Sequence, residues 1–263
     1  KLARVSDRAQ LPYDFVVLNE SVPNAWAMPG GKIALNRGLL VELKSEAELA
    51  AVIGHEIVHA AGRHGARGME NNLLLQAGAA ALSVANADSR YGRVVDTVAG
   101  VGVGLLGVKY GRDLELEADH YGMLYMQRAG YDPQAAVTLQ ETFVRLSKSK
   151  EANWLEGLFA SHPPSQERVD ETRKFAATLT GQFKNGEPEY QARIAPLLKA
   201  RAAYRHYDDG QQALTQKDAA QALRLADAAL TIEPREALFC GLRGDAHALL
   251  KQYAHKPSHG EIE

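Results

Sequence analysis

The sequence predicts an α+β protein: a mainly α-helical domain with a small β-hairpin or sheet near its N-terminus, followed by a second, helical segment. Three observations support this class. Short apolar runs flank the turn Pro29-Gly30-Gly31, a serine-capped amphipathic helix follows, and the composition changes around residues 181–188, beyond which alanine is frequent. We therefore place a domain boundary there and expect one domain over residues 1–180 and a helical region over residues 181–263.

The overall composition excludes several classes of protein. Among 263 residues, 30 Lys and Arg face 32 Asp and Glu, which gives a formal net charge of −2. A nucleic-acid binder needs a basic excess to neutralise phosphates, so this class is not expected. The single cysteine, Cys240, excludes an intramolecular disulfide and a multi-cysteine metal site. Any bound metal must be held by carboxylates and by some of the nine histidines.

The first predicted elements are strands. Residues 13–18, 25–28 and 32–36 have the alternation of polar and apolar side chains that is typical of strands, and the glycine turn between the last two indicates a hairpin. The helix that follows begins at Glu46, because Ser45 and Glu48 form a capping box. Apolar residues continue it at helical spacing, and the glycines at 62 and 65 indicate its end.

Further helices follow in the first domain. They are predicted over residues 73–82, 94–108, 114–128 and 133–146 and around Arg168. Val94–Val108 is the longest nearly apolar run, but it contains Asp96 and is shorter than the roughly 20 apolar residues needed to cross a bilayer. We interpret it as a buried helix or a loop packed near a site, and expect no membrane-spanning helix.

The second segment is predicted to be an array of helices over residues 201–210, 219–232 and 236–253. Ala222, Ala229 and Pro234 have the spacing found near the end of a tetratricopeptide unit. The segment would then hold about one and a half helix pairs, fewer than the roughly three units that usually make a stable array. An unrelated alanine-rich helical hairpin explains the same pattern.

The informative motif is HEIVH at residues 55–59, on the capped helix. Residues four positions apart lie about 40° apart around a helix and about 6 Å along it, so the imidazoles of His55 and His59 share one face and can bind one Zn²⁺. Glu56 lies about 100° around the helix from His55, where its carboxylate can act as a general base on a metal-bound water. Taken alone, the motif also fits two surface histidines on an ordinary helix.

A catalytic zinc site needs a third protein ligand, either a histidine or a carboxylate. In the metzincin arrangement, the third ligand is a histidine six residues after the second, but the corresponding position 65 is Gly. His64 is one residue short and would point about 140° away from His59 on a continuing helix, so we expect a structural role for His64. The segment ELEAD at residues 115–119 offers a carboxylate instead. Glu115 and Asp119 share one helix face, so that Glu115 can bind the metal while Asp119 accepts a proton from a ligand histidine. An isolated ExxxD would otherwise be a solvated helix face.

A family resemblance adds to these inferences. The motifs HEIVH, ELEADHYG about 55 residues later and SHPPSQERV, together with NAWAMPGGKI before them, resemble those of the zinc metallopeptidase family that contains the CAAX prenyl endopeptidase, HtpX and BepA. They span roughly residues 20–175. The resemblance implies a zincin-like protease domain of the gluzincin type, and it is closest to soluble, periplasmic, BepA-like proteases with a tetratricopeptide tail.

The resemblance also implies roles for single residues. His55, His59 and Glu115 would bind one Zn²⁺ per chain, Glu56 would be the catalytic base, and Asp119 would hydrogen-bond a ligand histidine.

Two further residues match the His-Pro…Arg element of the family. His162 and Arg168 would reach the active site, where they stabilise the oxyanion or, in BepA-like members, let His162 occupy the open zinc position as a latch. The chain lacks the spanning helices of the integral-membrane members, so their lipid-embedded substrates are not transferred.

We therefore expect a zinc-dependent endopeptidase that cleaves unfolded or misassembled polypeptides, in envelope protein quality control. Residues 32–36 would be an edge strand that pairs with an extended substrate. One alternative is a latched zinc protein that acts as a chaperone or binding module through its helical tail. Another is a zinc hydrolase of non-peptide amides.

The expected location is the bacterial periplasm, with peripheral association with a membrane left open. The sequence begins at Lys1, without an initiator Met or a hydrophobic signal segment, so we interpret the chain as a processed or truncated form.

Overall fold

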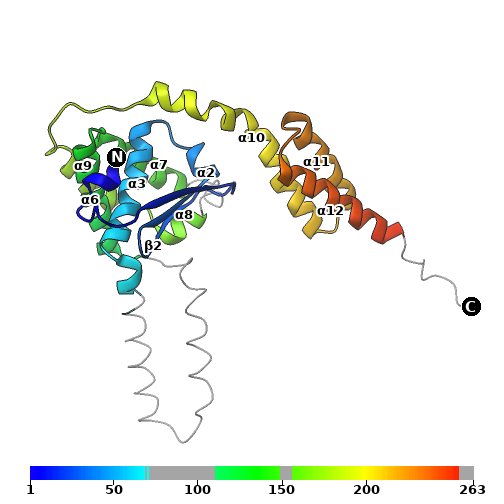
Figure 1. Ribbon diagram of the computed structural model, residues 1–263, viewed down its shortest axis with the longest axis horizontal. Coiled ribbons are helices and arrows are strands. Elements are labelled where there is room, and N and C mark those ends of the chain that lie inside the picture. Colours follow the sequence, from blue (N-terminus) through cyan, green and yellow to red (C-terminus); the bar gives the residue numbers. More distant parts are fainter. Residues whose placement is uncertain (69, 71–109, 149–155, 255–263) are drawn as a thin grey trace, which may run out of the picture. The chain divides into compact units, whose positions relative to one another are not determined.

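The computed structural model describes residues 1–68, 70, 110–148 and 156–254, and within them the chain is mostly helical with one small sheet (Figure 1). The chain forms two compact units, Lys1–Ala192 and Arg193–Glu263. In chain order, the elements are α1 (Leu2–Val5), β1 (Asp14–Leu18), β2 (Ala25–Met28), β3 (Lys32–Asn36), α2 (Arg37–Leu40), α3 (Glu46–Ala61), α6 (Arg112–Ala129), α7 (Gln134–Ser147), α8 (Glu156–Ser161), α9 (Gln166–Ala176), α10 (Glu187–Thr215), α11 (Ala219–Ile232) and α12 (Ala237–Ala254).

The sheet has the strand order β1-β3-β2. The predicted hairpin is confirmed: β2 pairs antiparallel with β3, and Gly30 and Gly31 make the turn with φ angles of +87° and +88°, which glycine adopts without strain. However, β1 also pairs with β3, in parallel. The prediction that residues 32–36 form an edge strand is therefore wrong, because both sides of β3 already carry a partner strand and cannot pair with a substrate.

Helix α3 begins where the sequence predicts. The Ser45 side chain caps it by accepting a hydrogen bond from the Glu48 backbone N–H at 3.1 Å. In a capping box, the Glu48 carboxylate would accept a hydrogen bond from the backbone N–H of Ser45. Here it accepts from the backbone N–H of Lys44 instead, at 2.7 Å. The helix ends at Ala61, with Gly62 as its C-cap residue.

Helices α3 and α6 cross in close contact (Figure 1). The contact lies at Gly54 and Gly122, where the two backbones almost touch. A Cβ atom built on Gly122 would lie 3.0 Å from the backbone nitrogen of His55, and one built on Gly54 would lie 3.0 Å from the carbonyl oxygen of Gly122. This approach brings the HEIVH segment of α3 next to the first half of α6.

The core of the first unit lies between the sheet and the helices. Helix α7 packs against α3 and α9, and α6 also packs against α9. Each contributing element buries at least one large apolar side chain almost completely; examples are Ile33, Ile57, Met123, Val137 and Val169. The outer strand β1 instead exposes Phe15, Val16 and Val17. Three short helices, α1, α2 and α8, were not predicted from the sequence.

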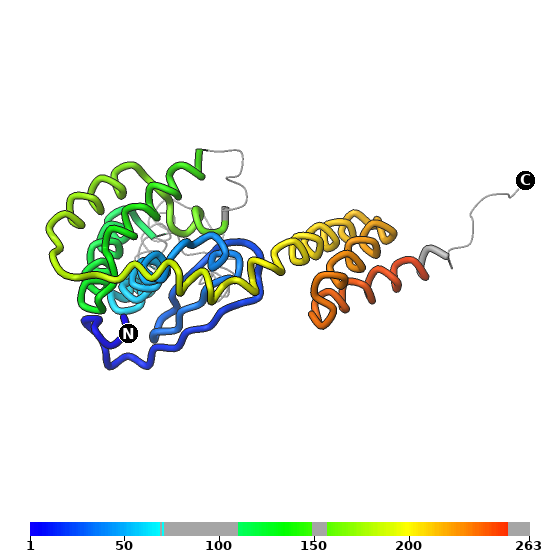
Figure 2. Tube along the Cα trace, turned by 90° about the horizontal axis from the view of Figure 1, so that it is seen from above, coloured from blue at the N-terminus to red at the C-terminus, as the bar shows by residue number. Residues whose placement is uncertain are grey.

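The second unit contains most of α10, with α11 and α12, and Figure 2 shows α11 and α12 running beside each other. Helix α10 is longer than predicted, since it begins at Glu187 and continues through Pro196. The unit has cores of its own in which alanine lets the helices approach closely. The two clusters consist of Ala200, Ala203, Tyr204, Ala229 and Phe239, and of Ala213, Ala222 and Ala246.

None of the helices in the described part of the chain combines the length and the apolar character needed to span a bilayer. The helices predicted over residues 73–82 and 94–108 lie outside the described residues.

Candidate metal centre

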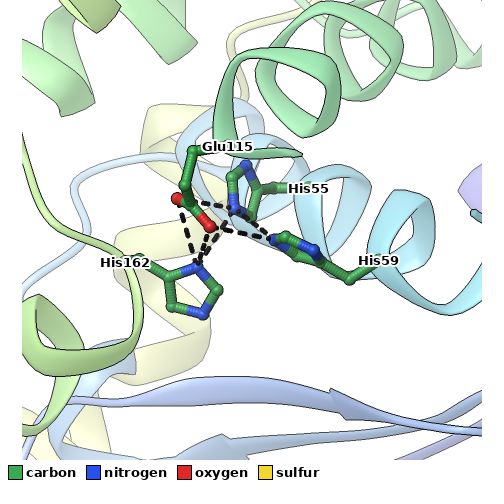
Figure 3. Close-up of side chains that lie close together, drawn as sticks. All are labelled: His55, His59, Glu115 and His162. Atoms are coloured by element: carbon green, nitrogen blue, oxygen red, sulfur yellow. Dashed lines mark hydrogen bonds and ion pairs between the residues drawn. The ribbon is translucent and has the colours of Figure 1, made fainter. Parts of the chain in front are cut away.

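Four side chains from three parts of the chain converge on one point (Figure 3). His55 and His59 come from α3, Glu115 from the first turn of α6, and His162 from the residue that follows α8. One nitrogen or oxygen atom from each can be chosen such that all four lie within 4.8 Å of one another. All four residues are 2–9% exposed.

The individual distances show how tightly the atoms are grouped. The Nε2 atoms of His55 and His59 are 3.0 Å apart, so the two imidazoles share one helix face as the i, i+4 spacing predicts. Glu115 reaches both of them, with one oxygen 3.5 Å from His55 Nε2 and the other 3.3 Å from His59 Nε2. The Nδ1 atom of His162 lies 3.2 Å from His55 Nε2 and 3.1 Å from a Glu115 oxygen.

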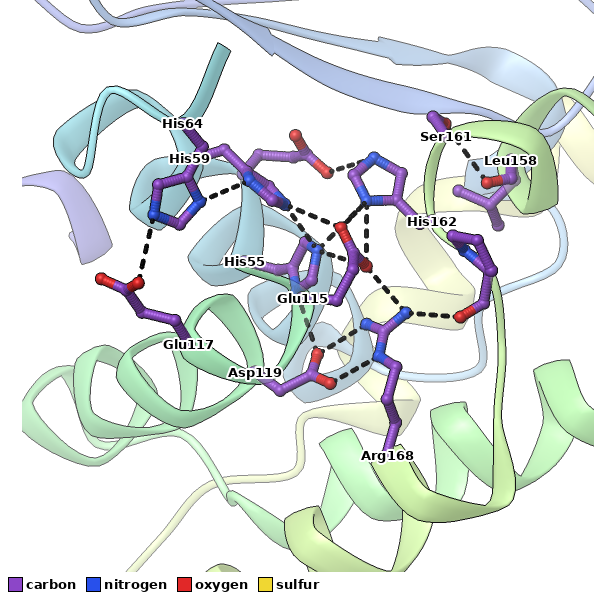
Figure 4. Close-up of polar contacts among 12 residues, drawn as sticks. His55, His59, His64, Glu115, Glu117, Asp119, Leu158, Ser161, His162 and Arg168 are labelled. Atoms are coloured by element: carbon purple, nitrogen blue, oxygen red, sulfur yellow. Dashed lines mark hydrogen bonds and ion pairs between the residues drawn. The ribbon is translucent and has the colours of Figure 1, made fainter. Parts of the chain in front are cut away.

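Asp119, one helical turn after Glu115, contacts the ring nitrogen of His55 that faces away from the other three donors. An oxygen of Asp119 lies 3.0 Å from His55 Nδ1 (Figure 4). Arg168 in turn donates two hydrogen bonds of 2.7 Å to Asp119 and forms an ion pair of 2.8 Å with Glu115. The amide of Gln140 also donates to Asp119, at 3.1 Å. Arg168 is itself positioned by the N-terminus of α9, where its backbone N–H bonds to Ser165 Oγ at 3.2 Å.

His59 is held differently, by an imidazole and a phenol ring. Its Nδ1 lies 2.9 Å from Nδ1 of His64, which is fully buried, and Nε2 of His64 lies 3.7 Å from a Glu117 oxygen (Figure 4). Tyr110 stacks on the His59 ring, with 3.8 Å between the ring centroids and 18° between the planes. The ring of His59 is therefore fixed on one edge and on one face.

Glu56 lies beside the cluster and is 2% exposed. One of its oxygens is 3.4 Å from Nε2 of His162, and the other has no hydrogen-bond partner among the described residues. Burial raises the pKa of the Glu56 carboxyl above its ordinary value. A buried carboxylate with a free oxygen and a raised pKa suits a group that accepts a proton.

The charges in the cluster favour a cation. Burial alone would lower the pKa of His55, but Glu115 and Asp119 raise it to about 10. Burial opposes ionisation of Glu115, yet the surrounding imidazoles hold its pKa far below the usual range. Asp119 is likewise kept ionised against the effect of burial by Arg168. Imidazoles must lose their extra protons to bind a metal, and the carboxylates of Glu56, Glu115 and Asp119 then outnumber the single guanidinium by two, an excess that a divalent ion would balance.

The donor set matches one metal in particular. Two or three imidazole nitrogens and one carboxylate oxygen, all within a few ångströms, fit the nitrogen and oxygen ligands of four-coordinate Zn²⁺. In catalytic zinc sites, three protein ligands leave one position open. Here a fourth donor, His162, is within reach of that position.

The structure thus brings together all seven site residues that the sequence singled out, and it adds three more. Tyr110 and Gln140 carry no sequence signal, because stacking and amide contacts follow no spacing rule. His64 was predicted to point away from His59 on a continuing helix. The helix instead ends at Ala61, and Arg63 adopts a φ of +56° that turns the chain back.

Comparison with known proteins adds independent information. The sequence pattern of peptidase family M48 matches residues 1–176. The chain is similar to the mitochondrial metalloendopeptidase OMA1 of Arabidopsis thaliana, with 34% identity over 166 residues that cover 63% of this chain and 32% of the relative.

Two proteins of Escherichia coli (strain K12) are also similar. Its β-barrel assembly-enhancing protease is 27% identical over 222 residues, which cover 82% of this chain and 44% of the relative. Its metalloprotease YcaL is 30% identical over 163 residues, which cover 62% of this chain and 61% of the relative. The chain thus spans less than two thirds of the length of each of these relatives.

Proposed function

The chain belongs to peptidase family M48, and on this basis we propose that it is a zinc-dependent endopeptidase that hydrolyses peptide bonds of unfolded or misassembled proteins. The observation that carries the proposal is the buried convergence of His55, His59 and Glu115, next to a carboxylate of Glu56 with one unpaired oxygen. The enzyme names of the similar proteins support the same activity.

In this proposal, His55, His59 and Glu115 hold the zinc ion. A zinc ion bound there would supply Lewis-acid chemistry, polarising a peptide carbonyl and lowering the pKa of a bound water to about 7. The protein residues fix the orientation of the ligands. Asp119 accepts the Nδ1–H of His55, so that the Nε2 lone pair of His55 faces the metal position.

Glu56 is the proposed general base. Its buried carboxylate takes a proton from the attacking water and passes it to the leaving amine. The raised pKa brings its proton affinity closer to that of these partners, which favours transfer in both directions.

Arg168 and His162 complete the site. Arg168 offsets part of the negative charge of Glu115 and Asp119 and keeps both carboxylates in place through contacts of 2.7–2.8 Å. We assign His162 the role of a latch, because its Nδ1 belongs to the same donor group as the other three ligands. A latched site would open only when a substrate displaces the imidazole.

For the biological setting, we propose quality control of envelope proteins. Some similar proteins are named β-barrel assembly-enhancing proteases, which suits quality control of envelope proteins in a bacterial periplasm. The mitochondrial name of another relative suits a different compartment, so cell fractionation is the test. We propose that α10–α12 form a partial tetratricopeptide-like array that binds protein partners. Ala222 and Ala229 of its predicted repeat pattern are fully buried between helices, which supports this assignment.

The deciding experiment combines metal analysis with a cleavage assay. We expect the purified chain to contain one zinc per molecule and to degrade casein or an unfolded outer-membrane protein in a chelator-sensitive manner. Glu56→Gln should keep the zinc and lose cleavage by a factor of at least ~100. Glu171→Gln, on the exposed face of α9, is the matched control and should cleave normally. Full activity of Glu56→Gln would contradict the assigned base, and a chain that takes up no zinc would contradict the function.

A further inference from the structure

We propose that His64 is a positioning residue that orients the zinc ligand His59, an inference that rests on the proposed function. Its Nδ1 accepts the Nδ1–H of His59, and this hydrogen bond directs the Nε2 lone pair of His59 to the metal position. His64 would thus do for His59 what Asp119 does for His55, with a neutral acceptor in place of a carboxylate (Figure 4).

The backbone is arranged to return this ring to the site. Helix α3 stops at Ala61, and Arg63 has a φ of +56°, a conformation that non-glycine residues rarely adopt. This reversal places the His64 ring 4.9 Å from the His59 ring, centroid to centroid, with 81° between the planes. A continuing helix would leave the two side chains on different faces.

The location of the protons follows from the contacts. If Nε2 of His59 binds the metal, its Nδ1 must carry the proton and donate it, so Nδ1 of His64 must present its lone pair. The proton of a neutral His64 ring is then on Nε2. An oxygen of Glu117 lies 3.7 Å from this Nε2, where its negative charge favours the N–H. Glu117 therefore selects the tautomer of His64 that can accept from His59.

The neighbouring glycine provides a way to move this ring without changing it. A Cβ atom on Gly62 would lie 2.4 Å from Nε2 and 2.7 Å from Cδ2 of His64, so alanine there must displace the imidazole. Gly62 has a φ of −75°, which alanine adopts freely, and the nearest backbone atom to the added Cβ is the carbonyl oxygen of Val58, at 3.1 Å. Gly65 offers a matched control, because the nearest atom to a Cβ there, Tyr110 Oη, is at an ordinary 3.9 Å.

The test is the zinc dissociation constant of the full-length chain, measured by competition with a chromogenic chelator. His64→Leu removes the acceptor and Gly62→Ala displaces it, and loss of such a partner typically weakens metal binding about 10–100-fold. In His64→Asn, the Oδ1 atom can occupy the position of Nδ1, so we expect affinity within a few-fold of the parent. Gly65→Ala should bind zinc like the parent. The absorption spectrum of the cobalt-substituted protein should change for His64→Leu and not for His64→Asn.

The outcomes separate this inference from the function on which it rests. Normal zinc affinity of both His64→Leu and Gly62→Ala, in a parent that binds zinc, overturns the inference alone. Equal losses in His64→Leu and His64→Asn also overturn it, since they would show that the imidazole only fills space. If His64→Leu does not fold, Gly62→Ala decides, because it keeps the imidazole. A parent chain that binds no zinc removes the proposed function, and the inference with it.

Discussion

His162 is the residue whose two nitrogens face different groups. Its Nδ1 lies 3.1 Å from Glu115, among the proposed ligands, whereas its Nε2 lies 3.4 Å from Glu56, the proposed base. The imidazole therefore occupies the space between the metal position and the base. A substrate carbonyl that is to reach both must take that space.

For this reason we predict that His162→Ala accelerates the cleavage of casein. A charge-assisted hydrogen bond is worth about 1.5–3 kcal/mol, so removing the latch should raise the initial rate roughly 10–100-fold. The rate is measured at equal zinc occupancy. His120→Ala is the control, because its imidazole stacks on Phe175, away from the donor group. A fall in rate would assign His162 to stabilising the oxyanion instead.

The site residues could be predicted from the sequence where they lie within one turn of each other on the same helix. The i, i+4 spacing places His55 and His59 on one face, and the same rule pairs Glu115 with Asp119. His162 could be assigned only through family resemblance, since a loop histidine 107 positions away from His55 has no local signal. The place of His64 depends on the positive φ of Arg63, which nothing in the sequence indicates.

At the scale of elements, the close crossing of α3 and α6 joins two of the ligand-bearing segments. We predict that Gly122→Ala separates these helices, because its Cβ would lie 3.0 Å from the backbone nitrogen of His55. Overpacking of this kind costs about 1–3 kcal/mol in the free energy of unfolding. It should also weaken zinc binding, since Glu115 moves with α6.

Urea unfolding and chelator competition measure the two effects. Gly68→Ala is the control, since nothing lies within 4 Å of a Cβ at that position. Parent-like stability and zinc affinity of Gly122→Ala would show that the crossing has room for a methyl group.

Within the first unit, the start of α3 also contacts a residue shortly after the end of α6 and the segment before α10. Glu46 accepts a hydrogen bond of 2.8 Å from the Tyr131 hydroxyl and pairs with Lys184 at 2.9 Å. Lys184 and Tyr131 hold the pKa of Glu46 below its ordinary value of 4.5. Because the folded pKa is lower than the unfolded one, the carboxylate stabilises the fold above about pH 4.5, and this contribution is lost as the pH falls through the folded pKa.

The corresponding prediction concerns Glu46→Gln. It should lower the free energy of unfolding by up to about 1 kcal/mol at pH 7, as is usual for partly exposed pairs. The difference from the parent should disappear below the folded pKa, where Glu46 is protonated in both states. Denaturant titrations of the parent and of Glu46→Gln at several pH values measure this. A constant difference across the pH range would contradict the assignment.

The elements themselves were mostly predictable. Caps, turn glycines and helical spacing located β2, β3, α3, α6, α7, α9, α11 and α12 closely. The parallel pairing of β1 with β3 was not predictable, because it joins strands that are not connected by a turn. The helix predicted over residues 201–210 is too short, because α10 begins at Glu187 and continues through Pro196 to Thr215.

In the whole molecule, each compact unit has its own core, and among the described residues the group that could hold a metal lies in the first unit. Bound zinc should therefore stabilise the first unit alone. At a free zinc concentration of 100 times the dissociation constant, the gain is about 2.7 kcal/mol, or roughly 5–10 °C for a domain of this size.

Calorimetry of the full chain with and without chelator measures this effect. One transition should move with zinc and the other should not. In Glu115→Gln, which loses a ligand, the shift should be much smaller. A chelator effect on both transitions would show that the two units unfold together.

The centre also has a consequence for how the protein is made. Helix α3 can form as soon as it leaves the ribosome, since its hydrogen bonds are local. Arg168, which holds both Glu115 and Asp119, is synthesised more than a hundred residues after His55. A nascent chain therefore carries the HEIVH helix long before it carries the arginine that holds Glu115 and Asp119, so we expect the complete arrangement of the site to form only after residue 168 has been synthesised.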